Sequence, residues 1–149
     1  MSAGASFRLR VYYEDTDLAG VVYYANYLRF LERARTEALL AVGIDQALLR
    51  RELGVVFAVR RVAIDYLAPA RFQDMLDVTT AVVEIGGARI DLLQTVLRDG
   101  SPLARAEVTV VGIGDDGRPS RISAEIRDAL TVLNLDGNSA EGSQSGKRP

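Results

Sequence analysis

The sequence has 149 residues, of which 48% are hydrophobic and 26% are charged, and its formal net charge is −2. This length predicts one domain with an ordinary core, and the slightly negative charge argues against a general nucleic-acid-binding surface. The chain has no cysteine and no histidine, which excludes disulfides, Cys/His zinc sites, thiolate nucleophiles and Ser-His triads. An enzyme of this composition must therefore use carboxylates, hydroxyls, arginines or backbone N–H groups.

The first part of the chain predicts a strand followed by a long helix. Apolar and polar residues alternate over residues 7–13, as in a strand with one buried face. Over residues 26–42, apolar residues recur every three or four positions, which predicts a helix that ends at Gly43. Leu28 and Leu40 widen its apolar face, so we expect this helix to be well buried.

The middle of the chain is dominated by predicted strands. A short helix capped by Asp45 and ending near residue 53 comes first. Four segments rich in Val, Ile, Thr and Leu then predict strands, at residues 55–67, 75–85, 88–98 and 103–113. Gly86-Gly87 and Asp99-Gly100 are hairpin signals, so we expect these strands to follow one another in antiparallel succession.

The C-terminal part predicts a helix and a polar tail. Ser123 can cap a helix over residues 123–133, and residues 134–149 have almost no apolar side chains. We therefore expect one α+β domain over residues 1–133 and a disordered tail over 134–149. In this domain one long central helix is wrapped by a curved antiparallel sheet of about five strands. Such a sheet leaves edges open, which favours a homodimer or a higher oligomer.

The segment from Tyr13 to Asn26, which reads YEDTDLAGVVYYAN, joins the first predicted strand to the long helix. A helix N-terminus offers unpaired N–H groups and the positive end of the helix dipole, which can polarise a carbonyl or hold an oxyanion. Asp17 lies a few residues before this terminus, so its carboxylate and the N–H groups could face one substrate atom. In the alternative interpretation, Glu14, Asp15 and Asp17 form a solvated loop that provides one helix cap.

Two other charged groups have both a functional and a structural interpretation. On the long helix, one set of side chains could be catalytic or could form ion pairs at helical spacing: Glu32, Arg33, Arg35 and Glu37. A set of arginines could bind phosphates or could balance the acids: Arg60, Arg61, Arg71, Arg89, Arg118 and Arg121. Asp15 and Asp17 begin like a Ca²⁺ loop, but position 19 is Ala, so we expect no metal site.

The segment YEDTDLAGVVYYANYLRFLERARTE, residues 13–37, resembles the signature of hotdog-fold acyl-CoA thioesterases. It is most similar to the Tol-Pal-associated, YbgC-like subgroup and to the aspartate type of 4-hydroxybenzoyl-CoA thioesterase, and the resemblance covers residues 7–131. It implies a hotdog fold and hydrolysis of a thioester of coenzyme A, or of acyl carrier protein, without a cofactor. It also implies a homodimer or homotetramer whose active sites form where two subunits meet.

The same resemblance assigns roles to single residues. It places the catalytic aspartate on Asp17, a supporting tyrosine on Tyr13, and the N–H groups that polarise the thioester carbonyl near Tyr24. Position 24 is usually His in the YbgC-like subgroup, whereas Tyr24 matches the 4-hydroxybenzoyl-CoA type. The other motif residues expected to contact the substrate are Gly20, Val21, Val22, Tyr23, Asn26 and Tyr27. Whether Asp17 attacks the carbonyl or activates water stays open at this point.

The chemistry tolerates the missing histidine. The coenzyme A thiol should have a pKa near that of cysteine, about 8.5, so its thiolate can leave without a strong general acid. A carboxylate and an oxyanion site can then suffice. The alternative is a non-catalytic hotdog protein that binds acyl groups or partner proteins, since fold does not fix function. A hotdog hydratase or dehydratase is disfavoured because those relatives use a histidine.

The location is predicted from the absence of sorting features in the sequence. We find no signal-peptide pattern and no apolar run near the roughly 18 residues of a transmembrane helix. We therefore expect a cytoplasmic protein with no integral membrane segment and no nucleic-acid partner.

Overall fold

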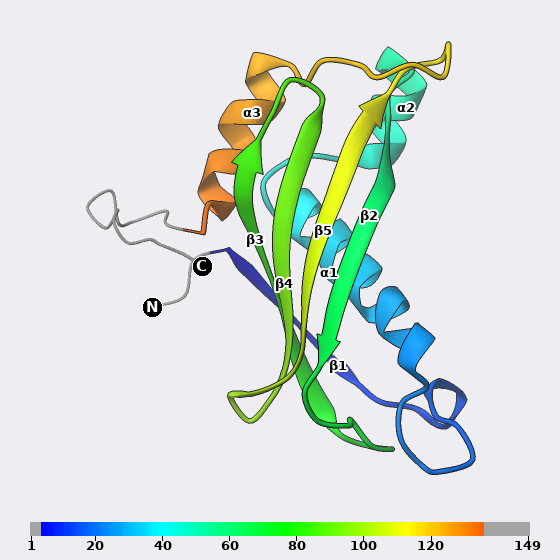
Figure 1. The fold of residues 1–149 in the computed structure, drawn as a ribbon. Coiled ribbons are helices and arrows are strands. Elements are labelled where there is room, and N and C mark those ends of the chain that lie inside the picture. Colours follow the sequence, from blue (N-terminus) through cyan, green and yellow to red (C-terminus); the bar gives the residue numbers. More distant parts are fainter. Residues whose placement is uncertain (1–3, 136–149) are drawn as a thin grey trace.

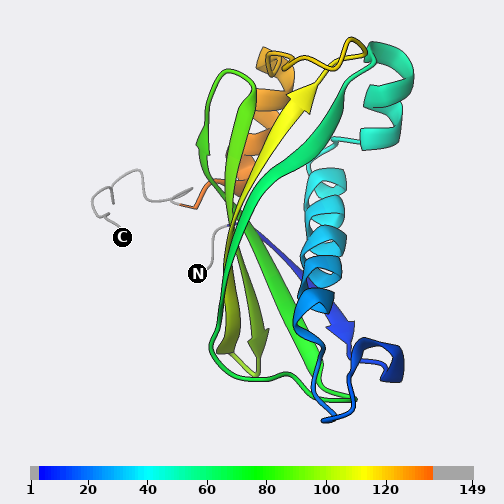
Figure 2. The ribbon, with the colours of Figure 1, turned by 45° about the vertical axis from the view of Figure 1, so that its right-hand side comes forward.

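The computed structural model describes residues 4–135, which form a curved antiparallel sheet with a long helix lying across one face (Figures 1 and 2). The five strands are β1 (Ala5–Arg10), β2 (Val56–Tyr66), β3 (Met75–Ile85), β4 (Arg89–Arg98) and β5 (Ser101–Ile113). The α-helices are α1 (Tyr27–Ala41), α2 (Gln46–Leu53) and α3 (Ala124–Leu130). The α+β architecture predicted from the order of the elements is confirmed.

The strands are arranged in the order β1-β3-β4-β5-β2, and each neighbouring pair is antiparallel. Both hairpin signals are confirmed, since Gly86-Gly87 joins β3 to β4 and Asp99-Gly100 joins β4 to β5. Asp99 and Gly100 have φ values of 52° and 80°, as a tight two-residue hairpin requires. The expected succession is wrong for β2, which pairs with β5 at the far edge of the sheet. Its link to β3, residues 67–74, is not a tight turn, so the chain can cross the end of the sheet.

The long helix α1 packs one face against the sheet. Buried side chains at helical spacing form that face: Phe30, Leu31, Ala34 and Ala38. Leu28 and Leu40, by contrast, are 45% and 46% exposed, so the expectation that they widen the buried face is wrong. At about 100° of rotation per residue, both positions fall outside the arc that faces the sheet.

A polar network joins α1 to the middle of the sheet. Gln94 on β4 is fully buried, and its Nε2 donates to the Leu31 carbonyl oxygen at 3.0 Å and to Thr80 Oγ1 at 2.8 Å. Its Oε1 accepts from Arg35 Nη1 at 3.1 Å. Burial lowers the pKa of Arg35, and the nearby Glu32 carboxylate opposes that shift. Arg35 therefore takes part in packing the helix on the sheet.

The C-terminal helix begins where the sequence predicts. Ser123 caps α3 through its side-chain oxygen, and the helix continues into a 3-10 turn, Thr131–Leu133. Asn134 then forms a parallel bridge with β3. The rest of the predicted tail, residues 136–149, lies outside the described residues. In the part of the chain that the structure describes, no helix is long and apolar enough to cross a membrane.

Candidate active site

The connection from β1 to α1 carries the predicted catalytic residues (Figure 1). It consists of a 3-10 turn, Tyr13–Asp15, a loop, and a second 3-10 turn, Tyr24–Asn26, that runs directly into α1. Within the loop, the Asp17 N–H donates to the Val21 carbonyl oxygen at 2.9 Å, and the Gly20 N–H donates to the Asp17 carbonyl oxygen at 2.9 Å. Gly20 has a φ of 78°, which glycine adopts without strain. These bonds close the loop tightly just before the start of α1.

Asp17 presents an exposed carboxylate on this loop. Its Oδ1 accepts from the Ala19 N–H at 2.9 Å, which orients the side chain. Within residues 4–135, Oδ2 takes part in no hydrogen bond or ion pair and is open to a substrate or a water molecule. Over the same residues, no group of three acidic side chains is placed to hold a metal ion.

The start of the helix offers two N–H groups close to this loop. Tyr24 and Ala25 begin the second 3-10 turn, and in the described part of the chain their N–H groups have no acceptor. The Asn26 N–H, in contrast, donates to the Tyr23 carbonyl oxygen at 2.8 Å. The first N–H groups of a helix carry the positive end of its dipole. They are therefore suited to stabilise an oxyanion.

Asp15 is buried, with 5% of its surface exposed, and it connects the two ends of the loop. Its Oδ2 accepts from the Tyr12 N–H at 2.8 Å, and its Oδ1 accepts from Asn26 Nδ2 at 2.9 Å. Its carbonyl oxygen accepts from the Tyr23 N–H at 3.0 Å. Asp15 thus fixes the start of α1 relative to the end of β1. The sequence offers Asp15 only as one acid of a solvated loop and does not predict its burial, because no local pattern joins it to Asn26, 11 residues away.

An apolar groove of about 290 Å³ lies beside the start of α1. Its lining comes from the loop, from α1 and from the end of β2 with the link that follows: Val22, Tyr24, Tyr27, Tyr66, Leu67, Ala68 and Pro69. The Tyr66 hydroxyl donates to the Tyr24 carbonyl oxygen at 2.9 Å, and the two rings meet edge-on with centroids 6.3 Å apart. Burial raises the pKa of Tyr66, and the Tyr27 and Tyr24 hydroxyls add to the shift. The bond from the Tyr66 hydroxyl joins the end of β2 to the 3-10 turn that precedes α1.

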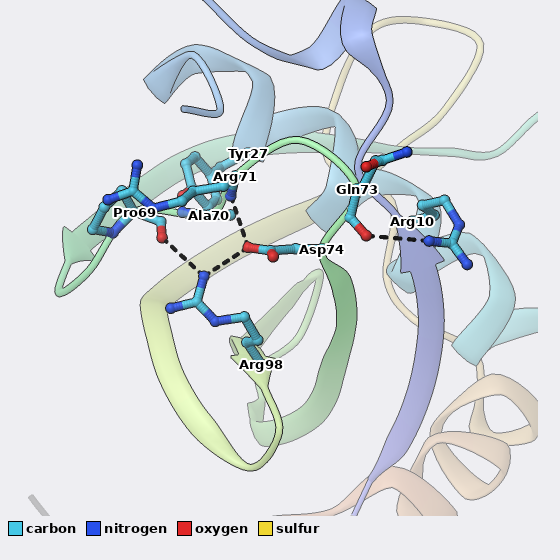
Figure 3. Close-up of polar contacts among 8 residues, drawn as sticks. All are labelled: Arg10, Tyr27, Pro69, Ala70, Arg71, Gln73, Asp74 and Arg98. Atoms are coloured by element: carbon cyan, nitrogen blue, oxygen red, sulfur yellow. Dashed lines mark hydrogen bonds and ion pairs between the residues drawn. The ribbon is translucent and has the colours of Figure 1, made fainter. Parts of the chain in front are cut away.

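The link between β2 and β3 supports this groove (Figure 3). The Tyr27 hydroxyl oxygen accepts from the Ala70 N–H at 3.1 Å. Asp74 Oδ2 accepts from the Arg71 N–H at 2.8 Å and from Arg98 Nη1 at 2.6 Å. The link is therefore held both by α1 and by the end of β4. The sequence gives no signal for the contact between Asp74 and Arg98, because these two residues lie 24 positions apart and far along the chain from the motif.

The Tyr27→Phe variant should lose about 1–3 kcal/mol of the free energy of unfolding, because the fully buried Ala70 N–H loses its acceptor. Urea unfolding followed by circular dichroism measures the change. Tyr23→Phe is the matched control, since Tyr23 is 49% exposed and its hydroxyl has no hydrogen bond to any described residue. Equal stability of the two variants would show that the contact with Ala70 contributes nothing.

The chain matches a known family over most of its length. A model of the thioesterase-like superfamily matches residues 11–130. The chain belongs to the thioesterase-like superfamily. It is 48% identical over 132 residues to the acyl-CoA thioesterase YbgC of Haemophilus influenzae, covering 87% of this chain and 96% of that protein. It is 44% identical over 104 residues to the acyl-CoA thioester hydrolase YbgC of Escherichia coli O157:H7, covering 69% of this chain and 77% of that protein.

Solved structures of other thioesterase-like proteins share the fold. A probable thioesterase from Bartonella henselae superposes with a TM-score of 0.78 at 36% identity, covering 81% of this chain and all of that one. Together with the family match, this superposition confirms the predicted hotdog-like fold.

The motif residues of this thioesterase-like protein occupy three kinds of position. One set lies on the loop or at the start of the helix: Asp17, Gly20, Val21, Val22, Tyr23 and Tyr24. Asn26 and Tyr27 are buried, and their side chains make the internal hydrogen bonds described above. Tyr13 is 81% exposed, and its ring packs edge-on against Phe72 with centroids 6.3 Å apart. The roles predicted for these residues toward a substrate stay predictions.

Proposed function

We propose that this chain hydrolyses the thioester bond of an acyl-CoA, with Asp17 as nucleophile or general base. One observation carries the proposal: a single short connection combines an exposed carboxylate with N–H groups that lack acceptors among the described residues. The Haemophilus influenzae relative, which matches 87% of this chain, is named an acyl-CoA thioesterase. The reaction proposed here is of the same class.

In the proposed mechanism, the thioester carbonyl oxygen accepts hydrogen bonds from the N–H groups of Tyr24 and Ala25, which makes the carbonyl carbon more electrophilic. Asp17 then either attacks that carbon, forming an acyl-aspartate that water hydrolyses, or removes a proton from an attacking water. In both routes the C–S bond breaks and coenzyme A leaves as a thiolate. Because the pKa of such a thiol is about 8.5, no general acid is needed. This agrees with a sequence that has no histidine.

The apolar groove is the proposed site of the acyl group. Its aromatic walls, Tyr24, Tyr27 and Tyr66, adjoin the start of α1, where the carbonyl would be held. Coenzyme A is the proposed carrier, with acyl carrier protein as the second candidate. The proposal includes a cytoplasmic location and a catalytic domain over residues 1–133 that is followed by a separate tail. It also includes membership of the Tol-Pal-associated, YbgC-like subgroup, which the resemblance implies.

Thiol release from a panel of acyl-CoA substrates tests the proposed reaction. The panel runs from acetyl-CoA to palmitoyl-CoA and includes benzoyl-CoA and 4-hydroxybenzoyl-CoA. We expect saturable turnover of at least one member, and the preferred member defines the acyl class. Tight binding without any thiol release would favour the alternative, a non-catalytic acyl-binding or protein-interaction module. The observation behind this alternative is that Tyr24 stands where the subgroup usually has His.

A homodimer paired through β2 is the proposed assembly. β2 pairs with β5 on one side, and no strand in the described part of the chain covers its other edge. Val56, Val59 and Tyr66 on this strand are 38%, 47% and 46% exposed. A long edge strand with exposed apolar side chains favours pairing with a second copy. Since Tyr66 also lines the groove, such pairing would bring the second subunit to the site, and two such dimers could form a homotetramer.

Sedimentation equilibrium should therefore give the wild-type chain a mass of at least twice 16.2 kDa. Val59→Lys should shift the protein toward the monomer, because the proposed pairing would bury the new charge. Val83→Lys is the matched control, since Val83 is 54% exposed on β3, away from the open edge. A wild-type chain that is monomeric and fully active would contradict the proposed assembly.

A further inference from the structure

We propose that Arg71 binds a phosphate group of the substrate's carrier, coenzyme A or phosphopantetheine, at the rim of the apolar groove. The inference rests on the proposed function and adds a residue that recognises the carrier rather than the acyl group. The proposed substrate brings negative phosphates to a chain whose formal charge is −2. A cation close to the groove is needed to offset that repulsion.

The backbone of Arg71 is fixed beside the catalytic loop. Its N–H donates to Asp74 Oδ2 at 2.8 Å, and the residue forms an antiparallel bridge with Val21. The Val21 carbonyl oxygen in turn accepts from the Asp17 N–H at 2.9 Å. Two successive backbone contacts therefore join Arg71 to the proposed catalytic residue.

The side chain of Arg71 is exposed, and within residues 4–135 its guanidinium has no hydrogen bond or ion pair. Asp74, whose Oδ2 binds the Arg71 backbone, uses the same oxygen for its 2.6 Å ion pair with Arg98. Two other arginines that the sequence offers as phosphate ligands, Arg61 and Arg89, form ion pairs with nearby acids. The guanidinium of Arg71 is thus available to an external anion.

The direction of the side chain distinguishes Arg71 from other arginines. In Figure 3 it extends toward Pro69, which lines the groove. Arg10 lies on the opposite side of the link, where its Nη1 donates to the Gln73 carbonyl oxygen at 3.2 Å. The segment 118–121, which carries two more arginines, follows β5 at the other end of the sheet (Figure 1). A planar guanidinium at the rim of the groove can bind a phosphate through two parallel hydrogen bonds.

Kinetics on substrates with and without phosphates test the inference. The same acyl group is supplied on coenzyme A, on 4′-phosphopantetheine and on pantetheine, which has no phosphate. The wild-type chain is compared with Arg71→Ala and with Arg71→Lys, which keeps the charge but loses the planar fork. Arg10→Ala is the matched control, because it removes an exposed arginine that contacts the same link. Thermal melting shows that each variant is folded.

For Arg71→Ala we expect the KM for acyl-CoA to rise about 5- to 20-fold, as for one charge-assisted hydrogen bond at an exposed position screened by salt. The KM for acyl-pantetheine should change by less than about two-fold. Arg71→Lys should raise the KM for acyl-CoA by a smaller factor, and Arg10→Ala should leave it unchanged. If the KM for acyl-phosphopantetheine also rises, Arg71 contacts the phosphate that coenzyme A shares with acyl carrier protein. If only the KM for acyl-CoA rises, Arg71 contacts a phosphate of the nucleotide part of coenzyme A.

The inference is overturned if Arg71→Ala raises the KM equally for acyl-CoA and acyl-pantetheine, or changes neither. Failure of the proposed function gives a different result, since the wild-type chain then releases no thiol from any carrier. In that case, isothermal titration calorimetry measures the Kd values of coenzyme A and of pantetheine for the wild-type chain and for Arg71→Ala, without any turnover. Equal Kd values for coenzyme A in the wild-type chain and Arg71→Ala would contradict the phosphate contact.

Discussion

The Asp17→Asn variant is expected to fold normally and to lose acyl-CoA hydrolysis, with kcat/KM reduced by about 100- to 10,000-fold. In the described part of the chain, the Asp17 carboxylate makes one hydrogen bond, in which Oδ1 accepts from the Ala19 N–H at 2.9 Å. Asn keeps an oxygen at this position, so the loop keeps its conformation. The variant loses the negative charge and the basicity of the carboxylate, on which both proposed routes depend.

Glu14→Gln is the matched control for this experiment, because Glu14 is an exposed carboxylate in the neighbouring 3-10 turn. Thiol release is measured side by side, and circular dichroism shows that each protein is folded. We expect Glu14→Gln to keep kcat/KM within about two-fold of the wild-type value, as for an ordinary surface change. If Asp17→Asn kept more than about a tenth of the wild-type kcat/KM, Asp17 would be neither nucleophile nor general base.

The Asp15→Ala variant should lose about 2–4 kcal/mol of the free energy of unfolding. The buried carboxylate accepts from the Tyr12 N–H at 2.8 Å and from Asn26 Nδ2 at 2.9 Å, and Ala leaves both donors without their acceptor. These bonds fix the start of α1 relative to β1. We therefore expect kcat to fall as well, because the N–H groups at the start of α1 shift relative to Asp17.

Urea unfolding measures the stability change, and Asp15→Asn separates the charge from the hydrogen bonds. Asn keeps one oxygen acceptor, so its stability should lie between those of the wild-type chain and Asp15→Ala. Asp17→Asn serves as the exposed control and should unfold like the wild type. A loss below about 0.5 kcal/mol for Asp15→Ala would mean that the start of α1 is held by other contacts.

Local sequence signals predict most of the elements of this fold. Asp45 and Ser123 cap α2 and α3 as expected, because a helix cap depends on residues next to it in the sequence. Asp99-Gly100 forms the expected hairpin for the same reason. The place of β2 depends instead on the whole sheet, and its link to β3 contains no tight-turn signal. Apolar residues lie on more than one side of α1, so the sequence did not define the arc that faces the sheet. Leu28 was expected to be buried for this reason and is 45% exposed.

The candidate site could be predicted only in part. Asp17 and Tyr24 lie on one continuous segment, so a resemblance to a family motif was enough to locate them. Tyr66 and the Asp74–Arg98 ion pair come from β2, from the link and from β4, and only the folded sheet brings them beside that segment. Contacts between residues so far apart leave no periodic pattern in a single sequence.

The most direct test is a crystal structure of the Asp17→Asn variant with an uncleaved acyl-CoA. We expect the thioester carbonyl oxygen about 2.7–3.1 Å from the backbone nitrogen of Tyr24 or Ala25, the range for an oxyanion-hole donor. The carbonyl carbon should face the side chain at position 17, and the acyl group should lie in the groove beside Tyr66. A thioester bound with its carbonyl away from both the helix start and position 17 would contradict the proposed mechanism.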